Sequence, residues 1–138
     1  MRILALDYGS RRIGIAISDE LKIIAQPLEY IPAQPFVEVV TRLKQLVQEK
    51  EVELIVVGMP RNMDGSYGPA AERVQQFVSE LKKVIPLRIK KWDERLTTSQ
   101  ANRILIQADV RRQKRKQMVD KMAAAILLQS YLDAPTES

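Results

Sequence analysis

Residues 3–18 read ILALDYGSRRIGIAIS, and this stretch decides how the chain begins to fold. The apolar run Ile3–Leu6 is typical of a short strand that ends at Asp7. From Arg12 to Ile17 apolar side chains alternate with small or polar ones, which predicts a second strand. Because the turn Tyr8-Gly9-Ser10 between the two strands is short, we expect them to pair antiparallel.

The rest of the chain extends this hairpin into a mixed sheet with helices. The run Ile23–Tyr30 predicts a third strand, and Pro27 within it indicates a sheet edge. The later predicted elements are a helix over Pro35–Lys50, a strand over Leu54–Val57, a loop over Gly58–Gly65, a helix from Pro69 with Ala70, Val74, Phe77, Val78, Leu81 and Ile85 inward, a strand over Leu87–Trp92, a helix from Thr97 or Thr98 with Ala101, Ile104 and Leu105 inward, and a helix over Gln117–Leu132. The order βββαβαβαα predicts an α/β fold, in which a five-stranded mixed sheet with an antiparallel meander of three strands is flanked by helices.

Composition restricts the chemistry that this chain can carry. The 138 residues suffice for one domain, predicted to span 1–138, and 46 % of them are hydrophobic. The absence of cysteine and histidine excludes disulfides, thiolate or imidazole metal ligands and histidine-dependent triads. The amino terminus does not resemble a signal peptide and no apolar run approaches a membrane span, so we expect a cytoplasmic protein that does not bind membranes.

Acidic residues follow two predicted strands at the same edge of the sheet. Asp7 ends the first strand, and Asp93 and Glu94 end the fifth. Because these strands are expected to be parallel, their carboxyl ends meet at the edge where α/β sheets bind ligands. Asp120 falls in the predicted opening turn of the last helix and in line with Ala124, so we expect its carboxylate to need a partner or a metal ion.

Each acid also has a purely structural interpretation. Asp7 would accept backbone hydrogen bonds in the turn that follows it, and Asp120 would be stabilised by the helix dipole. Asp93 or Glu94 would pair with Arg95 or cap the next helix. These interpretations weaken when the acids are taken together, because a set of carboxylates in a chain without histidine or cysteine is what Mg2+ prefers.

The sequence therefore predicts a Mg2+ or Mn2+ site of the two-metal type on Asp7, Asp93, Glu94 and Asp120. Two ions about 4 Å apart would activate a water molecule and stabilise the leaving oxygen of a phosphodiester without a histidine base. The net charge of +5 favours a polyanionic partner without requiring one. A basic run precedes Asp120; it is either a solvated surface or a set of phosphate contacts, and it comprises Arg111, Arg112, Lys114, Arg115 and Lys116.

Four motifs, in order along the chain, resemble one protein family. They are ALDYGSRRIGIAISD at residues 5–19, VVGMPRNMDGS at 56–66, WDERLTTSQA at 92–101 and VDKMAAAILLQSYL at 119–132. Together they extend over nearly the whole chain and are similar to the YqgF family of pre-16S rRNA nucleases, also called RuvX and described as Holliday-junction resolvases. The resemblance implies an RNase H-like fold, which agrees with the predicted order of elements.

The resemblance also implies roles for individual residues. The implied catalytic residues are Asp7, Glu94 and Asp120, with Asp93 as a further metal ligand. The implied substrate contacts are Asn62 and Asp64 in a loop rich in Asn, Asp and Gly, together with Arg12 and Arg95. RuvC-type resolvases carry an acid after the fourth strand, where this chain has Gly58-Met59-Pro60, so the resemblance passes that duty to Glu94.

The implied function is metal-dependent endonucleolytic processing of the 5′ end of pre-16S rRNA in ribosome biogenesis, by a monomer or weak homodimer acting on RNA or ribosomal particles. Holliday-junction resolution on branched DNA is one alternative, and a non-catalytic RNA-binding assembly factor is another. A nucleotide-binding protein of the actin type is disfavoured, because 138 residues leave no second lobe. Tyr8 and Trp92 are candidates for stacking on bases, although a tryptophan at a strand end more often belongs to the core.

Overall fold

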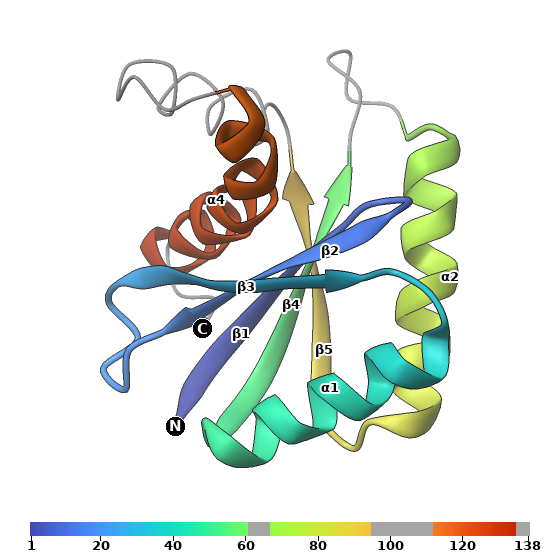
Figure 1. Cartoon of the computed structure of the whole chain (residues 1–138). Coiled ribbons are helices and arrows are strands. Elements are labelled where there is room, and N and C mark those ends of the chain that lie inside the picture. The colour runs from blue at the N-terminus through green and yellow to red at the C-terminus, as the bar shows by residue number, and fades with distance from the viewer. Residues whose placement is uncertain (61–66, 95–111, 135–138) are drawn as a thin grey trace.

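The computed structural model describes residues 1–60, 67–94 and 112–134, and for residues 94 and 112–121 it describes the backbone alone. The elements, in chain order, are β1 (Arg2–Tyr8), β2 (Arg12–Ser18), β3 (Ala25–Pro32), α1 (Phe36–Glu49), β4 (Val52–Pro60), α2 (Pro69–Val84), β5 (Arg88–Glu94) and α4 (Arg112–Asp133) (Figure 1). The predicted helix that begins at Thr97 or Thr98 lies outside the described residues.

The five strands form one mixed sheet in the order β3-β2-β1-β4-β5. The pairs β1–β2 and β2–β3 are antiparallel, whereas β1–β4 and β4–β5 are parallel. The predicted meander and the predicted parallel strands are both confirmed. β3 is an edge strand, as Pro27 indicated, and it begins at Ala25, two residues later than predicted. Its pairing with β2 shifts register between Ile15 and Ala16, next to Pro27, where the ladder is already interrupted.

The helices cover the two faces of the sheet unequally. Helices α1 and α2 lie on one face, and α4 crosses the other (Figure 1). Successive strand residues point to opposite faces, so in β1 Leu4 and Leu6 join the core beneath α1 and α2, while Ile3 and Ala5 pack beneath α4. We call these the α1/α2 face and the α4 face.

Two strands extend further toward the candidate site than the sequence indicated. β4 continues to Pro60, so Gly58, Met59 and Pro60 are strand residues and not the start of a loop. They remain paired with β5, whose final residues Asp93 and Glu94 lie beside Met59 and Pro60. The apolar run in the sequence ends before β4 does. The last residues of β4 belong to the strand because their backbone pairs with β5, which a pattern of apolar residues does not reveal.

The stripe of α2 also differs slightly from the prediction. Val74, Phe77, Val78 and Leu81 are buried as expected, and so is Ile85 directly after the helix. Ala70, however, is exposed, and Ala71 takes its place in the core. Ala70 and Ala71 are adjacent, and either one fits the helical spacing that leads to Val74. Periodicity alone therefore could not decide which of the two is buried.

Helix α4 begins at Arg112, five residues before the predicted start at Gln117. Arg112, Lys114, Arg115 and Lys116 therefore lie in the opening turns of the helix instead of preceding it. Asp120 lies about two turns into α4 rather than in its first turn. The helix dipole acts mainly within the first turn, so it no longer accounts for an acid at this position. In the part of the chain that the structure describes, no helix is long and apolar enough to cross a membrane.

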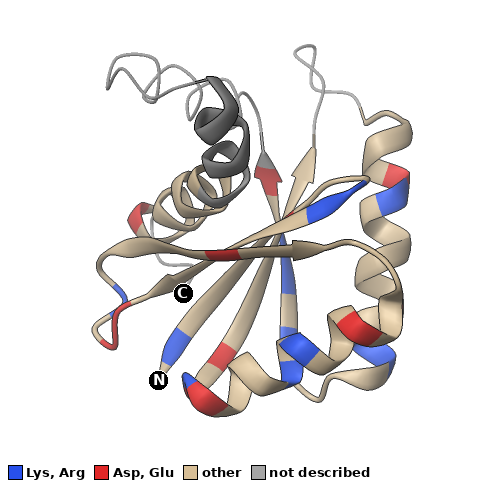
Figure 2. Ribbon diagram, in the orientation of Figure 1, with Lys and Arg blue, Asp and Glu red and all other residues tan. Residues whose placement is uncertain are grey.

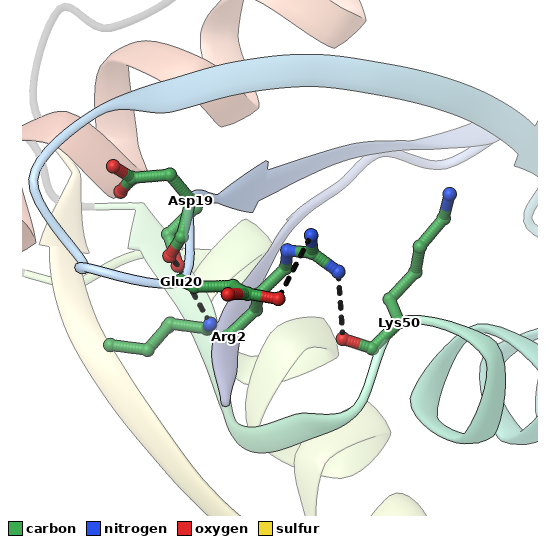
Figure 3. A network of polar contacts seen from close by, with 6 residues as sticks. Arg2, Asp19, Glu20 and Lys50 are labelled. Carbon is green, nitrogen blue, oxygen red and sulfur yellow. Dashed lines mark hydrogen bonds and ion pairs between the residues drawn. The ribbon is translucent and has the colours of Figure 1, made fainter.

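Polar contacts hold the start of β1 at the edge of the sheet opposite its carboxyl end (Figure 3). Arg2 donates from Nη1 to the carbonyl oxygen of Lys50 at 3.3 Å and lies 3.7 Å from Glu20. The backbone amide of Ile3 donates to Ser18 Oγ at 2.9 Å. Ser18 is the one buried polar residue among the described side chains, and this bond satisfies it. β1 is thus fixed in register at the end remote from Asp7.

Candidate active site

Asp7 lies on the α4 face, near the carboxyl end of β1. Its neighbours Leu6 and Tyr8 belong to the α1/α2 face, where the Tyr8 ring stacks on Phe77 with centroids 4.5 Å apart. The alternation of the strand therefore directs Asp7 to the same side as Ala5, whose surroundings belong to α4. The Asp7 side chain is half-buried. The parallel strands β4 and β5 end at this same edge, as predicted (Figure 1).

Glycines lie on both sides of Asp7 in the sheet. Asp7 pairs directly with Gly14 of β2. On its other side, the parallel register places Leu6 beside Val57, so the next residue of β4, Gly58, lies beside Asp7. A glycine has no side chain, so the two positions directly beside Asp7 carry no side chain on this face. Gly58, which the resemblance puts in the place of a fourth-strand acid, thus lies directly beside Asp7.

The turn after Asp7 depends on the glycine at position 9. The amide of Gly9 donates to the carbonyl oxygen of Arg12 at 2.9 Å. A Cβ atom at this position would lie 2.8 Å from that same oxygen, closer than real Cβ contacts come. The predicted tight turn is confirmed. The Gly9 amide is thus taken up by the carbonyl oxygen of Arg12, which closes the turn.

The two acids at the end of β5 differ in their surroundings. Asp93 pairs with Met59, which is buried in the α1/α2 core, and its Oδ1 accepts a hydrogen bond from Tyr67 Oη at 3.1 Å. Tyr67 directly precedes Gly68, the N-cap of α2. Asp93 therefore lies on the opposite face from Asp7, and the structure does not bring these two carboxylates together. Glu94 pairs through its backbone with Pro60, and its side chain lies outside the described part.

The Trp92 side chain lies on the α4 face of β5. Its ring packs edge-on against Tyr131 of α4, with centroids 5.1 Å apart, and its Nε1 donates to Ser130 Oγ at 3.3 Å. Trp92 therefore serves the packing of α4, as the more common role of such a tryptophan suggested. Tyr8 is likewise engaged in packing, on Phe77. Neither ring is presented for stacking on a base.

Helix α4 crosses the face that carries Asp7. Its residues Ala124, Leu127 and Leu128 are fully or almost fully buried against Ala5 and Ala16 of the sheet. Small residues on both sides allow the helix backbone to approach the strands closely. Gln129 fastens the helix further by accepting from one backbone amide of the β2–β3 hairpin, at Ala25, and donating to a carbonyl oxygen of the same hairpin. Position 120 lies one helical turn before Ala124.

The predicted substrate contacts are described to different extents. Arg12 begins β2, and its guanidinium carbon lies 5.7 Å from the centroid of the Tyr30 ring. The backbone positions of Arg112, Lys114, Arg115 and Lys116 are in the first turns of α4. Asn62, Asp64, Arg95 and Arg111 lie outside the described residues. Tyr30 was not predicted from the sequence, because its position beside Gly14 emerges only once the register of β3 is known.

Basic and acidic positions separate along β5, whose first half carries Arg88, Lys90 and Lys91 and whose end carries the acids (Figure 2). Among the described side chains, no three His, Cys, Asp or Glu residues gather in a group that could hold a metal ion. Of the predicted ligands, only Asp7 and Asp93 have described side chains. All four are carboxylates, the hard oxygen donors that Mg2+ and Mn2+ prefer.

A family model described as "RuvX: Holliday junction resolvase" matches residues 1–134. A protein of Halothermothrix orenii named "Putative pre-16S rRNA nuclease" is 53 % identical over 133 residues, covering 96 % of this chain and 95 % of that protein. A protein of the same name from Caldanaerobacter subterraneus is 48 % identical over 139 residues and is covered completely, as is this chain. Both relatives align over almost their whole length.

Solved structures of junction resolvases share the fold. The structure of T. thermophilus RuvC in complex with a Holliday junction has a TM-score of 0.54 at 14 % identity, covering 96 % of this chain and 93 % of that one. The Fowlpox virus resolvase in complex with Holliday junction DNA has a TM-score of 0.58 at 12 % identity, covering 96 % of this chain and 97 % of that one. These likenesses establish an RNase H-like fold, and the match over residues 1–134 together with identities near one half shows that this chain belongs to the RuvX (YqgF) family of nucleases.

Proposed function

We propose that this protein is a divalent-metal-dependent endonuclease that processes the 5′ end of pre-16S rRNA. The observation that carries the proposal is the placement of Asp7. Its carboxylate is half-buried on the α4 face, has a glycine on each side, and lies where three parallel strands end. The names of the curated relatives favour rRNA as the substrate.

The proposed ligand set consists of Asp7, Glu94 and Asp120. Position 94 is two residues beyond Trp92, and the period of a strand assigns it to the α4 face that Trp92 contacts. Position 120 precedes the buried Ala124 by one turn, and the period of a helix assigns it to the side facing the sheet. Asp93 is bound to Tyr67 on the other face, so we favour Glu94 over Asp93 as the second ligand.

Oxygen ligands of this kind suit Mg2+ or Mn2+. When bound, a pair of such ions supplies an activated water molecule and stabilises the charge of the leaving oxygen. The chain itself binds and orients the substrate. Arg12 and the basic first turns of α4 lie on or beside the face that carries Asp7, where they would hold the phosphates that flank the cleaved bond. We expect the protein to act in the cytoplasm, as a monomer or weak homodimer, on RNA or ribosomal particles.

Asp7→Asn tests this proposal, with Asp19→Asn as a matched control. Both substitutions remove one carboxylate, but Asp19 lies in the β2–β3 turn at the opposite edge of the sheet (Figure 3). Wild-type protein and both variants are incubated with 5′-extended 16S rRNA precursor and with a four-way DNA junction, in Mg2+, in Mn2+ and in EDTA. We expect metal-dependent cutting of the precursor by the wild type and by Asp19→Asn, and a loss of at least 100-fold in Asp7→Asn.

Each other outcome selects a different function. Cutting of the junction alone, lost in Asp7→Asn, would replace rRNA processing by Holliday-junction resolution, the activity named by the family model. Tight binding of the precursor without cutting, unchanged in Asp7→Asn, would overturn the nuclease and indicate a non-catalytic assembly factor.

A further inference from the structure

One row of residues crosses the α4 face at the level of Asp7. β3 contributes Tyr30, which pairs with Gly14 of β2, and Gly14 in turn pairs with Asp7. Tyr30 is next to Ile31, whose side chain is buried on the α1/α2 face, so Tyr30 points to the α4 face like Asp7. Two strand spacings separate Tyr30 from Asp7, roughly 10 Å. The intervening residue has no side chain that would stand between them.

Tyr30 is presented differently from the other aromatic residues near this edge. Tyr8 is packed against Phe77 and Trp92 against Tyr131, whereas 36 % of the surface of Tyr30 is exposed on an edge strand. The Tyr30 ring therefore has surface that a ligand can contact.

The Arg12 guanidinium lies close to the Tyr30 ring. Its carbon atom lies 5.7 Å from the Tyr30 ring centroid, within the range of a cation–π contact. Arg12 lies diagonally across from Tyr30, because Arg12 pairs with Pro32 and Gly14 with Tyr30. A cation and an aromatic plane are thus held together beside the acid that we propose for catalysis. Proteins that bind single-stranded nucleic acid combine these two groups, the cation for a phosphate and the ring for a base.

We propose that Tyr30 and Arg12 form a subsite for one unpaired nucleotide next to the cleaved phosphodiester. The Tyr30 ring stacks on the base, and the Arg12 guanidinium binds the adjoining phosphate. The subsite rests on the proposed nuclease function and adds to it a substrate class, namely nucleic acid that is single-stranded at this position. Stacking on a ring does not read the sugar, so the subsite accepts RNA and DNA alike.

Binding without cutting tests the subsite directly. The full chain is titrated, in EDTA, with a fluorescent single-stranded oligonucleotide and with the corresponding duplex, each as RNA and as DNA. Tyr30→Leu keeps an apolar side chain but removes the aromatic plane, and Tyr30→Phe keeps the plane but removes the hydroxyl. We expect Tyr30→Leu to weaken single-strand binding about 5- to 100-fold and duplex binding less than 2-fold, and Tyr30→Phe to bind like the wild type.

Arg12→Gln provides an independent readout. It removes one phosphate contact, so the slope of log Kd against log salt concentration for the single strand should fall by about 0.7. Thermal unfolding of each variant checks that it is folded. Equal loss of single-strand and duplex affinity in Tyr30→Leu, or equal loss in Tyr30→Phe, would overturn the stacking role. Unchanged binding in Tyr30→Leu with cutting abolished in Asp7→Asn would refute the subsite and leave the nuclease intact, whereas unchanged cutting in Asp7→Asn would refute the nuclease.

Discussion

Replacing Gly9 by alanine tests how strongly the turn after Asp7 constrains the site. The added Cβ would lie 2.8 Å from the carbonyl oxygen of Arg12, which is 0.6 Å inside the 3.4 Å at which ordinary contact begins. The neighbour is a backbone atom, so the turn itself must move. The movement also lengthens the 2.9 Å hydrogen bond between the Gly9 amide and the same oxygen.

Three terms set the size of the effect. Overpacking of this kind costs about 1–3 kcal/mol, and a weakened hydrogen bond adds up to about 1 kcal/mol. The lower entropy of alanine in the unfolded chain returns about 0.4–1 kcal/mol. Together these terms lower the free energy of unfolding by about 2 kcal/mol, within a range of about 0–4 kcal/mol, and the Tm by roughly 6–8 °C for a chain of this length.

Activity should fall further than stability does. The turn joins Asp7 to Arg12, so a shift of the turn moves the proposed metal ligand and the proposed phosphate contact relative to each other. Misplacement of about 1 Å costs on the order of 100-fold in rate. Urea unfolding and cutting at saturating substrate are measured for Gly9→Ala and for Ser10→Ala, an exposed neighbour in the same turn expected to change stability by less than about 0.5 kcal/mol. A Gly9→Ala protein as stable and active as Ser10→Ala would refute this reasoning.

Three further predictions concern the rest of the site and the opposite edge. Glu94→Gln should lose at least 10-fold more cutting activity than Asp93→Asn, since Asp93 bonds to Tyr67 on the other face; equal losses would contradict the assignment of faces. Ala124→Leu should destabilise the fold by about 1–3 kcal/mol and lower activity, because Ala124 is fully buried between α4 and the sheet; urea unfolding with a cutting assay measures both effects. Two backbone amides of the β2–β3 turn donate to the Asp19 carboxylate and hold its pKa below the usual range. Its contribution is therefore present above about pH 4 and is lost as the pH falls through the lowered pKa, so these two amides should exchange hydrogen faster in acid in the wild type but not in Asp19→Asn.

The sequence predicted the sheet well because its signals were local. The alternation in β2, the proline on β3 and the acid at the end of β1 each follow from a few neighbouring residues. The start of α4 was placed too late because the basic run has no apolar stripe, although lysine and arginine are good helix formers. Apolar periodicity therefore did not reveal the first turns of α4, whose residues are mostly charged.

The candidate site was harder to predict than the fold, because its composition depends on pairing. Asp93 and Glu94 are adjacent in the sequence, and only the register of β5 with β4 separates the face bound to Tyr67 from the face of Trp92. Tyr30 likewise becomes a candidate substrate contact only once its pairing with Gly14 is known. Register in a mixed sheet is set by tertiary contacts that a single sequence does not display.

The position of Asp7 after four buried residues of β1 has a consequence for how this protein tolerates change during evolution. Leu4 and Leu6 lie in the larger core, where substitutions are selected through the amount of folded protein. Asp7 lies on the other face, and in its proposed role as a metal ligand its substitution would abolish cutting and leave the folded population intact. Ile3 and Ala5 on that same face are buried as well, so selection for abundance would act from Ile3 to Leu6 and selection for turnover would begin at Asp7. A library of variants scored for both would show this change within a single strand.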